Sequence, residues 1–158
     1  NTRGTESPRG KSQGEFDGGK DEHFDVEAAL AFVADRNLSN VWLLGWSFGT
    51  ELALKYGADK NIEGVILLSP PLHRTSEEEL KTWVGSGKQV VAIVPEFDDY
   101  LTPEPARQRF SVIPQAKVVG IDGAKHLWVG ENATKAVLDE VVRVISPEKV
   151  PLPTVFEA

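Results

Sequence analysis

The chain runs Val41-Trp42-Leu43-Leu44-Gly45-Trp46-Ser47-Phe48-Gly49 where an apolar stretch gives way to a segment with helical spacing, residues 50–56. A strand that turns directly into a helix through a serine lifts the serine hydroxyl above the sheet and strains the serine backbone. Residues two before and two after that serine must be small so that strand and helix can close on each other, and glycine is the smallest. This stretch predicts a strand, a nucleophile elbow at Ser47 and a helix.

Two downstream segments supply the partners that such a serine needs. A serine hydroxyl is a poor nucleophile until a base takes its proton, so the elbow predicts a carboxylate and then a histidine further along the chain. Asp98 and Asp99 follow the apolar run 90–94, at the carboxyl end of an expected strand, where open α/β sheets hold their chemistry. His126 follows a second apolar run, 118–121. We predict that Ser47, one of the two aspartates and His126 form a catalytic triad.

Each of these residues also has a plain structural interpretation. The pattern Gly-x-Ser-x-Gly occurs by chance, and Ser47 could simply cap a tight strand-to-helix turn. His126 could cap the helix expected at residues 131–145, or lie on the surface. The position of the serine between a strand and a helix, with both partners downstream in the right order, favours the catalytic interpretation.

Four pieces of the sequence resemble the α/β-hydrolase superfamily, in that family's order. They are Arg3-Gly4 with residues 10–17, then Gly45 to Gly49, Phe97-Asp98-Asp99 and Ala124-Lys125-His126. The chain looks like the carboxyl-terminal two-thirds of such a protein and is most similar to small, lidless, esterase-like members. The family places its aspartate three residues after a glycine at the strand end. Pro95 occupies that place here, so the resemblance favours Asp98 and leaves Asp99 as a solvated turn residue.

The rest of the chain alternates between strand and helix patterns. Helices are expected at 21–35, 48–57, 103–111 and 131–145, with a short one opening at Ser76, and strands at 40–45, 64–68, 89–94 and 116–121. Apolar runs without period-two alternation are typical of parallel strands buried on both faces. The pattern predicts a doubly wound, mostly parallel α/β sheet with helices on both faces. We expect one domain over residues 1–146, with a loop at 1–20, and an extended, proline-containing tail at 147–158.

Composition restricts the function without selecting it. The 158 residues are 41% apolar and carry a net charge of −7, which argues against a nucleic-acid partner because such a surface needs clustered Lys and Arg. No apolar run approaches the roughly 20 residues that span a bilayer, and no cationic start leads into an apolar run, so we expect no membrane partner and favour cytoplasm over secretion. Cysteine is absent and gives no information on the compartment. Triad chemistry needs no cofactor and no metal, and we expect neither.

The resemblance also implies that part of the sheet lies outside this sequence. In the family, another strand lies beside the one expected at 40–45, and the loop after it supplies the second oxyanion donor, opposite the backbone N–H of Phe48. Both would precede Asn1. An exposed apolar edge at 40–45 would be an aggregation hazard. We therefore expect an amino-terminal segment or a separate chain to complete the sheet.

The expected substrate is a small or soluble carboxylic ester. Lipases carry a cap of several helices between the strands that correspond to 64–68 and 89–94, and residues 69–88 leave room for one short helix. Trp46 is expected to line the acyl side of the pocket, and Leu72 and His73 to border it. A serine peptidase or acyltransferase with the same triad is the nearest alternative. A non-catalytic binding module of the same fold is a third hypothesis.

Overall fold

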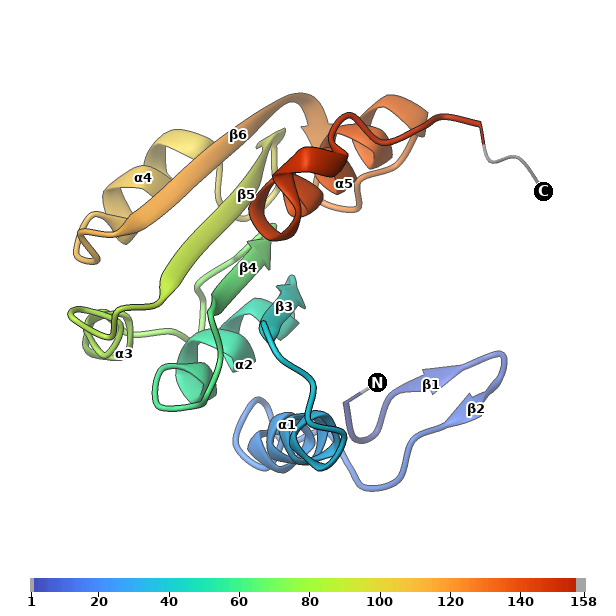
Figure 1. Cartoon of the computed structure of the whole chain (residues 1–158), viewed down its shortest axis with the longest axis vertical. Coiled ribbons are helices and arrows are strands. Elements are labelled where there is room, and N and C mark those ends of the chain that lie inside the picture. The colour runs from blue at the N-terminus through green and yellow to red at the C-terminus, as the bar shows by residue number, and fades with distance from the viewer. Residues whose placement is uncertain (1, 156–158) are drawn as a thin grey trace.

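A computed structural model of the chain describes residues 2–155. Its centre is a parallel four-stranded sheet in the order β3-β4-β5-β6, which is also the order along the sequence. The strands are β3 (Trp42–Trp46), β4 (Gly64–Leu68), β5 (Gln89–Phe97) and β6 (Ala116–Lys125) (Figure 1). A helix connects each strand to the next, as the alternating pattern predicted.

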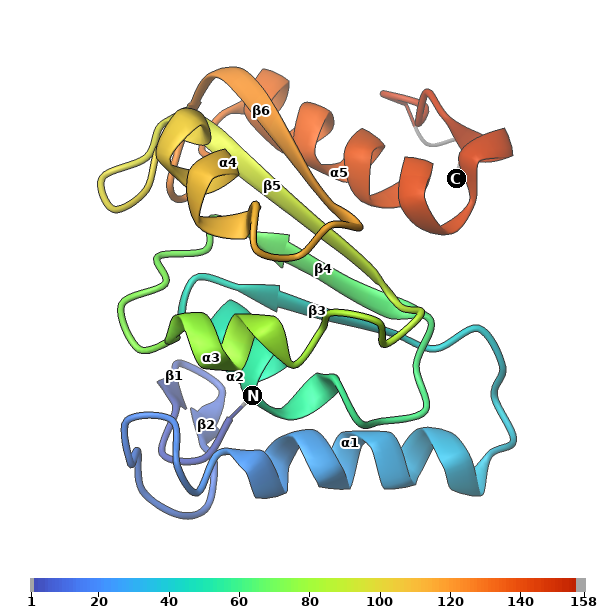
Figure 2. The same cartoon turned by 90° about the vertical axis from the view of Figure 1, so that its left-hand side faces the viewer.

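Helices cover both faces of this sheet. One face carries α2 (Phe48–Gly57), α3 (Glu77–Lys81) and α4 (Pro103–Phe110), and the other carries α5 (Glu131–Ile145), as Figures 1 and 2 show. The larger core lies under α2 to α4 and includes Leu54, Leu67, Trp83 and Phe110, whereas the smaller core lies under α5. The predicted doubly wound α/β architecture is confirmed.

The buried strands follow directly from their sequence. β4 and β5 are continuous apolar runs, and their residues on both faces are buried, from Gly64 to Leu67 and from Val90 to Pro95. A strand without polar positions needs cover on both faces, and α/β crossover connections supply that cover. The start of α3 is fixed by a capping box, in which Ser76 Oγ accepts from the Glu79 N–H and the Glu79 carboxylate accepts from the Ser76 N–H.

β5 and β6 are longer than the sequence pattern predicted. β5 continues to Phe97 and β6 to Lys125, and these two residues are paired beyond an irregularity between Pro95 and Phe97. Proline has no N–H to donate to a neighbouring strand, so an interruption at Pro95 is expected. Polar residues interrupt the ends of both strands, Glu96 in β5 and Asp122 and Lys125 in β6, so a search for apolar runs stops before them.

The amino-terminal segment was expected to be a loop over residues 1–20, and the structure adds a short ribbon within it. It contains a two-stranded antiparallel ribbon, β1 (Glu6–Ser7) and β2 (Gly10–Lys11). Ser12 holds the base of the ribbon, because its Oγ donates to the Thr2 carbonyl at 2.7 Å and accepts from the Thr5 N–H at 2.8 Å. These are side-chain to backbone bonds between polar residues, for which the sequence has no periodic signal.

Helix α1 (His23–Asp35) lies where a helix was predicted, but its aromatic residues are not core residues. Phe24 and Phe32 are exposed, and Val26 is the buried residue of the helix. Arginine guanidinium groups lie over both rings, Arg3 over Phe24 and Arg36 over Phe32. Cation–π contacts of this kind let an aromatic ring remain at the surface.

The carboxyl-terminal tail is only partly extended. Residues Pro147–Lys149 form a 3₁₀ turn, η1, and the Leu152 N–H then donates to the Asp139 carboxylate of α5 at 2.9 Å. Residues 156–158 of the predicted tail lie outside the described residues, and the division into a domain and a tail stays a prediction. Within residues 2–155, no helix is both long and apolar enough to cross a bilayer.

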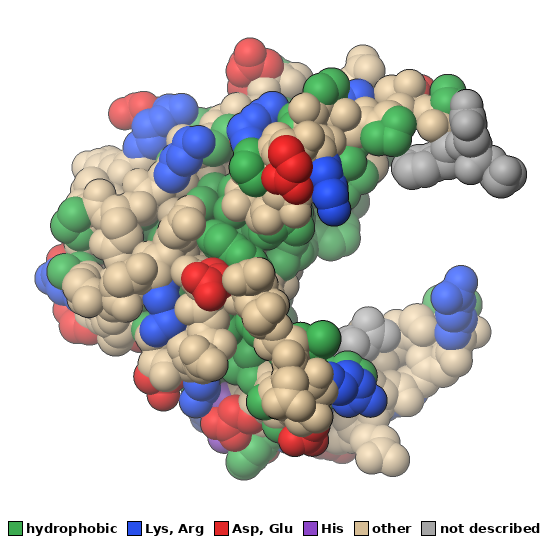
Figure 3. All heavy atoms as spheres, viewed as in Figure 1, with side chains coloured by type: hydrophobic (Ala, Val, Ile, Leu, Met, Phe, Trp, Pro, Cys, Tyr) green, Lys and Arg blue, Asp and Glu red, His purple; other side chains and the backbone are tan. Residues whose placement is uncertain are grey.

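β3 is an edge strand, although its sequence is that of an inner one. It pairs with β4 on one side, and Leu44 and Trp46 are each 47% exposed. Figure 3 shows the molecule hollowed between the carboxyl-terminal α5 and the amino-terminal ribbon, with hydrophobic side chains along the inner wall. The hydrogen-bonding edge of β3 faces this hollow, beside which Thr2 and Thr5 lie.

Candidate active site

Ser47 lies in a strained turn between β3 and α2. Its φ is +51° and its ψ is −120°, a conformation that residues with a side chain rarely adopt, and its N–H donates to the Leu68 carbonyl at 2.9 Å. A Cβ on Gly45 would lie 2.2 Å from the Gly49 carbonyl oxygen, so glycine is required there. A Cβ on Gly49 would meet no atom within 4 Å, because that position lines the hollow. The predicted steric need for a small residue therefore holds at Gly45 and is wrong at Gly49 in this structure.

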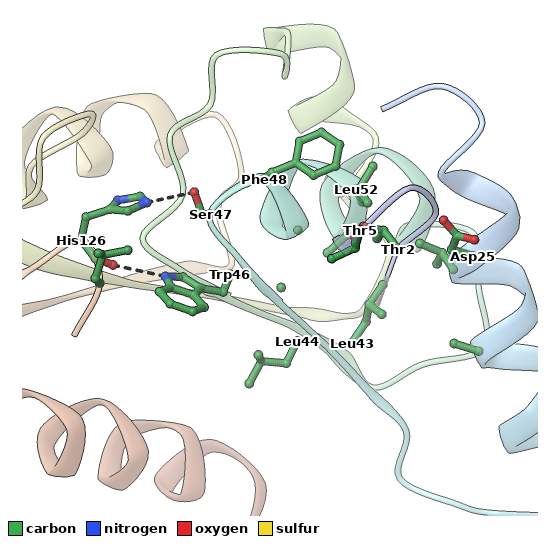
Figure 4. Close-up of a pocket in the computed structure, with 16 residues that line it drawn as sticks. Thr2, Thr5, Asp25, Leu43, Leu44, Trp46, Ser47, Phe48, Leu52 and His126 are labelled. Atoms are coloured by element: carbon green, nitrogen blue, oxygen red, sulfur yellow. Dashed lines mark hydrogen bonds between the residues drawn. The ribbon is translucent and has the colours of Figure 1, made fainter. Parts of the chain in front are cut away.

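The structure brings Ser47, His126 and Asp98 into one hydrogen-bonded chain. His126 Nε2 lies 2.9 Å from Ser47 Oγ, and His126 Nδ1 lies 2.9 Å from Asp98 Oδ2 (Figure 4 shows the first contact). His126 and Asp98 are 7% and 8% exposed. Asp98 is the aspartate that meets the imidazole, whereas the neighbouring Asp99 is exposed. An imidazole between a hydroxyl and a carboxylate can take the hydroxyl proton while the carboxylate fixes its tautomer.

Strand pairing explains why these side chains meet. β5 and β6 pair Phe97 with Lys125, so Asp98 and His126 are the next residues of two adjacent strands. β3 and β4 pair Trp46 with Leu68, which places Ser47 at the same edge of the sheet. The carboxyl ends of parallel strands share one edge, and the site lies there, as expected for open α/β sheets.

Asp98 is held in place by its own turn. Its Oδ1 accepts from the Tyr100 N–H at 2.8 Å and from the Leu101 N–H at 3.2 Å, which leaves Oδ2 for His126. The Tyr100 ring packs edge-on against the His126 imidazole, with 4.7 Å between ring centroids. Sequence analysis missed Tyr100, whose only signal was its position two residues after the aspartate.

Phe48 is the first residue of α2, so its N–H has no acceptor within the helix and lies at the positive end of the helix dipole. Its ring contacts Phe16 of the amino-terminal segment, with 5.2 Å between centroids, and the Arg74 guanidinium. The backbone N–H of Phe48 can therefore donate a hydrogen bond to an anion next to Ser47. The Phe48 ring packs between the amino-terminal segment and the loop that carries Arg74.

A cavity of about 850 Å³ opens beside Ser47 and extends along the free edge of β3. Trp46 lines it together with Ser47, His126 and the amino-terminal residues Thr2 and Thr5 (Figure 4), and its place on the acyl side stays a prediction. Leu72 and His73 do not line it. Leu72 is buried in the larger core, and His73 is exposed and packs against Tyr100, with 5.3 Å between centroids. Both were expected at the pocket because they follow the end of β4.

The segment that leads from the ribbon to α1 is fastened by a buried carboxylate. Glu22 is fully buried and accepts from the N–H groups of Asp17 and Gly19 at 2.9 and 2.8 Å. Burial by itself raises the pKa of Glu22, but these backbone donors and the nearby Arg3 outweigh it and leave that pKa below its ordinary value. Tyr56 of α2 fastens the same segment, because its hydroxyl donates to the Gly19 carbonyl. Burial raises the pKa of Tyr56, and the negative charges of nearby carboxylates raise it further.

A metal site is not formed by the side chains of residues 2–155, among which no group of three or more His, Asp or Glu is arranged to hold a metal ion.

Comparison with known proteins gives similarity in structure and not in sequence. No protein-family model and no curated protein matches the chain. Many solved structures match most of it, among them three α/β hydrolases. An α/β serine hydrolase homologue from Coxiella burnetii is 23% identical with a TM-score of 0.71, over 94% of this chain and 66% of that one. An α/β serine hydrolase without lid from Xanthomonas campestris is 23% identical with a TM-score of 0.67, over 91% and 64%. An esterase from Pyrococcus furiosus is 19% identical with a TM-score of 0.63, over 88% and 65%.

These matches establish the fold. The chain has the α/β-hydrolase architecture and resembles lidless, esterase-like serine hydrolases over nearly its whole length. It spans slightly less than two thirds of each of these three proteins. The resemblance predicted from the four sequence pieces is confirmed at the level of fold.

Proposed function

We propose that the chain is the triad-bearing part of a serine hydrolase that cleaves small, soluble carboxylic esters through an acyl-enzyme intermediate. The observation that carries the proposal is the chain of contacts Ser47–His126–Asp98, with 2.9 Å at each step. The fold alone would not support this proposal, because one fold hosts many functions and a function has to be inferred from the residues of the site.

The proposed reaction has two steps. Ser47 Oγ attacks the ester carbonyl carbon while His126 Nε2 takes the hydroxyl proton, and the tetrahedral oxyanion accepts a hydrogen bond from the Phe48 N–H. His126 then gives the proton to the departing alcohol. Water then attacks the acyl-enzyme as it loses a proton to His126. His126 returns that proton to Ser47 Oγ as the C–O bond to the acyl group breaks, and the acid leaves. Asp98 keeps the Nδ1 proton of the imidazole in place in both steps.

The open surroundings of Ser47 support small or soluble substrates. Between β4 and β5 the chain contains only α3, five residues long, and loops. A site without a lid leaves the nucleophile accessible to water and gives a long acyl chain little apolar surface to bury. The same triad could serve a peptidase or an acyltransferase, which differ in the leaving group or in the nucleophile that accepts the acyl group.

The same proposal includes a strand supplied from outside residues 1–158, beside β3. The free edge of β3, the cavity along it and the length of the matched proteins that this chain does not cover support it. Such a strand would cover Leu44 and Trp46 and, by the resemblance, bring the second oxyanion donor opposite Phe48. Losing one such donor costs about 10²- to 10³-fold in turnover.

Labelling with a fluorophosphonate probe tests the reaction. The probe should phosphonylate the folded chain at Ser47, detectable by intact mass and by the modified peptide, and Ser47→Ala should stay unlabelled. Hydrolysis of p-nitrophenyl acetate against p-nitrophenyl palmitate, with a p-nitroanilide in parallel, then separates soluble ester, lipid-like ester and amide substrates. A folded chain that stays unlabelled would favour the binding module instead.

The completing strand needs a separate measurement. The intact mass of native material, compared before and after elution in denaturant, should reveal a longer chain or a second one. A lone 17.3 kDa chain that is monomeric, folded and fully active on a small ester would contradict this part of the proposal.

A further inference from the structure

The backbone carbonyl of His126 accepts two side-chain hydrogen bonds. Trp46 Nε1 donates to it at 3.2 Å, a contact drawn in Figure 4, and Ser69 Oγ donates to it at 3.1 Å. The donors lie 80 and 57 residues away in sequence. A carbonyl oxygen has two lone pairs, so this pair of donors uses both.

Both donors come from the strand ends that form the site. Trp46 is the last residue of β3 and immediately precedes Ser47, and Ser69 immediately follows β4. Because Trp46 pairs with Leu68, the two donors approach the carbonyl from adjacent strands. The turn that carries His126 is thereby tied to the same strand that carries Ser47.

Ser69 has a backbone that glycine would adopt more easily. Its φ is +49°, it is 1% exposed, and its N–H donates to the Ile93 carbonyl at 3.0 Å. A non-glycine residue in the left-handed region is strained, and strain of this kind is informative when a side-chain contact accompanies it. The contact that a glycine could not make is the hydrogen bond from Oγ to His126.

The His126 ring needs such a fixed backbone because it must meet two partners at once. Ser47 lies on one side of the imidazole and Asp98 on the other, each at 2.9 Å. A shift of the backbone by about 1 Å would lengthen at least one of these contacts, and a displacement of that size can cost about 10²-fold in rate.

We propose that Trp46 and Ser69 are positioning residues, whose joint hydrogen bonds to the His126 carbonyl hold the imidazole between Ser47 and Asp98. This inference rests on the proposed function for its effect on rate, whereas its effect on geometry is independent of that function. Neither residue touches the substrate through these donors, so loss of either bond should lower kcat and leave KM nearly unchanged.

The test uses Trp46→Phe, Ser69→Gly and the double variant in the full chain. Trp46→Phe keeps an aromatic ring and removes the N–H, and Ser69→Gly removes the hydroxyl while suiting the positive φ. Trp42→Phe is the matched control, because it makes the same ring change on the same face of β3, four residues from the strand end. The readouts are kcat and KM on p-nitrophenyl acetate, thermal unfolding, and the crystal structure of each variant.

Each single variant should lose several-fold in kcat, and the double variant about 10²-fold, with unfolding close to that of the control. KM should stay within about twofold in Ser69→Gly, because the Ser69 side chain is buried, whereas Trp46 itself lines the cavity and its replacement also changes the cavity wall. The His126 ring should leave Asp98 or Ser47 in the double variant. A double variant with the kcat of Trp42→Phe, or with the ring still at both contacts, overturns the proposal. If the parent chain hydrolyses no ester, the proposed function fails and ring position alone decides this inference. If Ser69→Gly does not fold, the half-exposed Trp46→Phe carries the same comparison.

Discussion

β3 and β4 are adjacent parallel strands of similar composition with opposite exposure. β4 is Gly-Val-Ile-Leu-Leu and is buried along nearly its whole length, whereas β3 is Trp-Leu-Leu-Gly-Trp and its Leu44 and Trp46 are about half exposed. The difference arises from their neighbours. β4 lies between two strands, and β3 has one strand and an open edge.

The triad contacts and the open edge of the sheet therefore depend on different parts of the molecule. Ser47, Asp98 and His126 follow the ends of β3, β5 and β6, so their arrangement depends on pairing that is present within the chain. The free edge of β3 takes no part in those contacts. A strand added there should therefore change stability and oxyanion stabilisation while it leaves the triad contacts in place.

Substitution of the nucleophile gives the largest expected effect. Ser47→Ala should lower ester turnover by on the order of 10³-fold or more, because no other group can form the acyl-enzyme. Thermal unfolding should be unchanged or slightly improved, since the strained residue loses only a hydroxyl. Ser111→Ala, at the exposed end of α4, is the control and should retain full activity. Substantial turnover by folded Ser47→Ala would show that the strand ends do not hold the chemistry.

The two aspartates after β5 give the next largest contrast. Asp98→Asn should lower kcat by on the order of 10²- to 10³-fold, because an amide cannot hold the imidazole in the tautomer that accepts the serine proton. Asp99→Asn, which removes the same charge one residue away on an exposed side chain, should change kcat by less than about twofold. Steady-state kinetics on one ester measures both, and equal losses would argue for a charge effect and against orientation.

Leucine truncation on the two strands measures the open edge directly. Leu67→Ala, in a fully buried side chain of β4, should lower the free energy of unfolding by about 2–5 kcal/mol. Leu44→Ala, in β3, should cost less than about 1 kcal/mol, because half of that side chain already meets water. Urea unfolding of both variants gives the comparison. Similar losses would mean that β3 is covered in solution by a further strand or by a second copy of the chain.

The last prediction concerns the buried carboxylate of Glu22, between the ribbon and α1. The folded-state pKa of Glu22 lies below its ordinary value of 4.5, so its stabilisation is complete above that pH and is lost as the pH falls through the lower, folded value. Glu22→Gln should cost about 1 kcal/mol near neutral pH, through weaker bonds to the Asp17 and Gly19 N–H groups. It should also flatten the acid limb of the stability curve. If the free energy of unfolding of Glu22→Gln falls with acid pH as steeply as that of the parent chain, other carboxylates cause that pH dependence.

Local sequence determined the elements and the chemical groups of this protein. The helices at 48–57 and 131–145 and the strand at 64–68 agree with the predicted limits, because helix and strand periods and the elbow glycine are local properties. The order of serine, aspartate and histidine was visible for the same reason, and it named the candidate residues before any contact was known.

Tertiary structure decided what lies beside each of those residues. The pairing of Phe97 with Lys125 places Asp98, and not Asp99, beside His126. The two donors to the His126 carbonyl, Trp46 and Ser69, are far from it in sequence, and so is Tyr100, whose ring packs against the imidazole. The positions of Leu72 and His73, the open space at Gly49 and the exposure of β3 likewise depend on neighbours in space. A sequence pattern reports the preference of a residue for burial or for a conformation, whereas the register between strands and the strands that are present determine whether that preference is met.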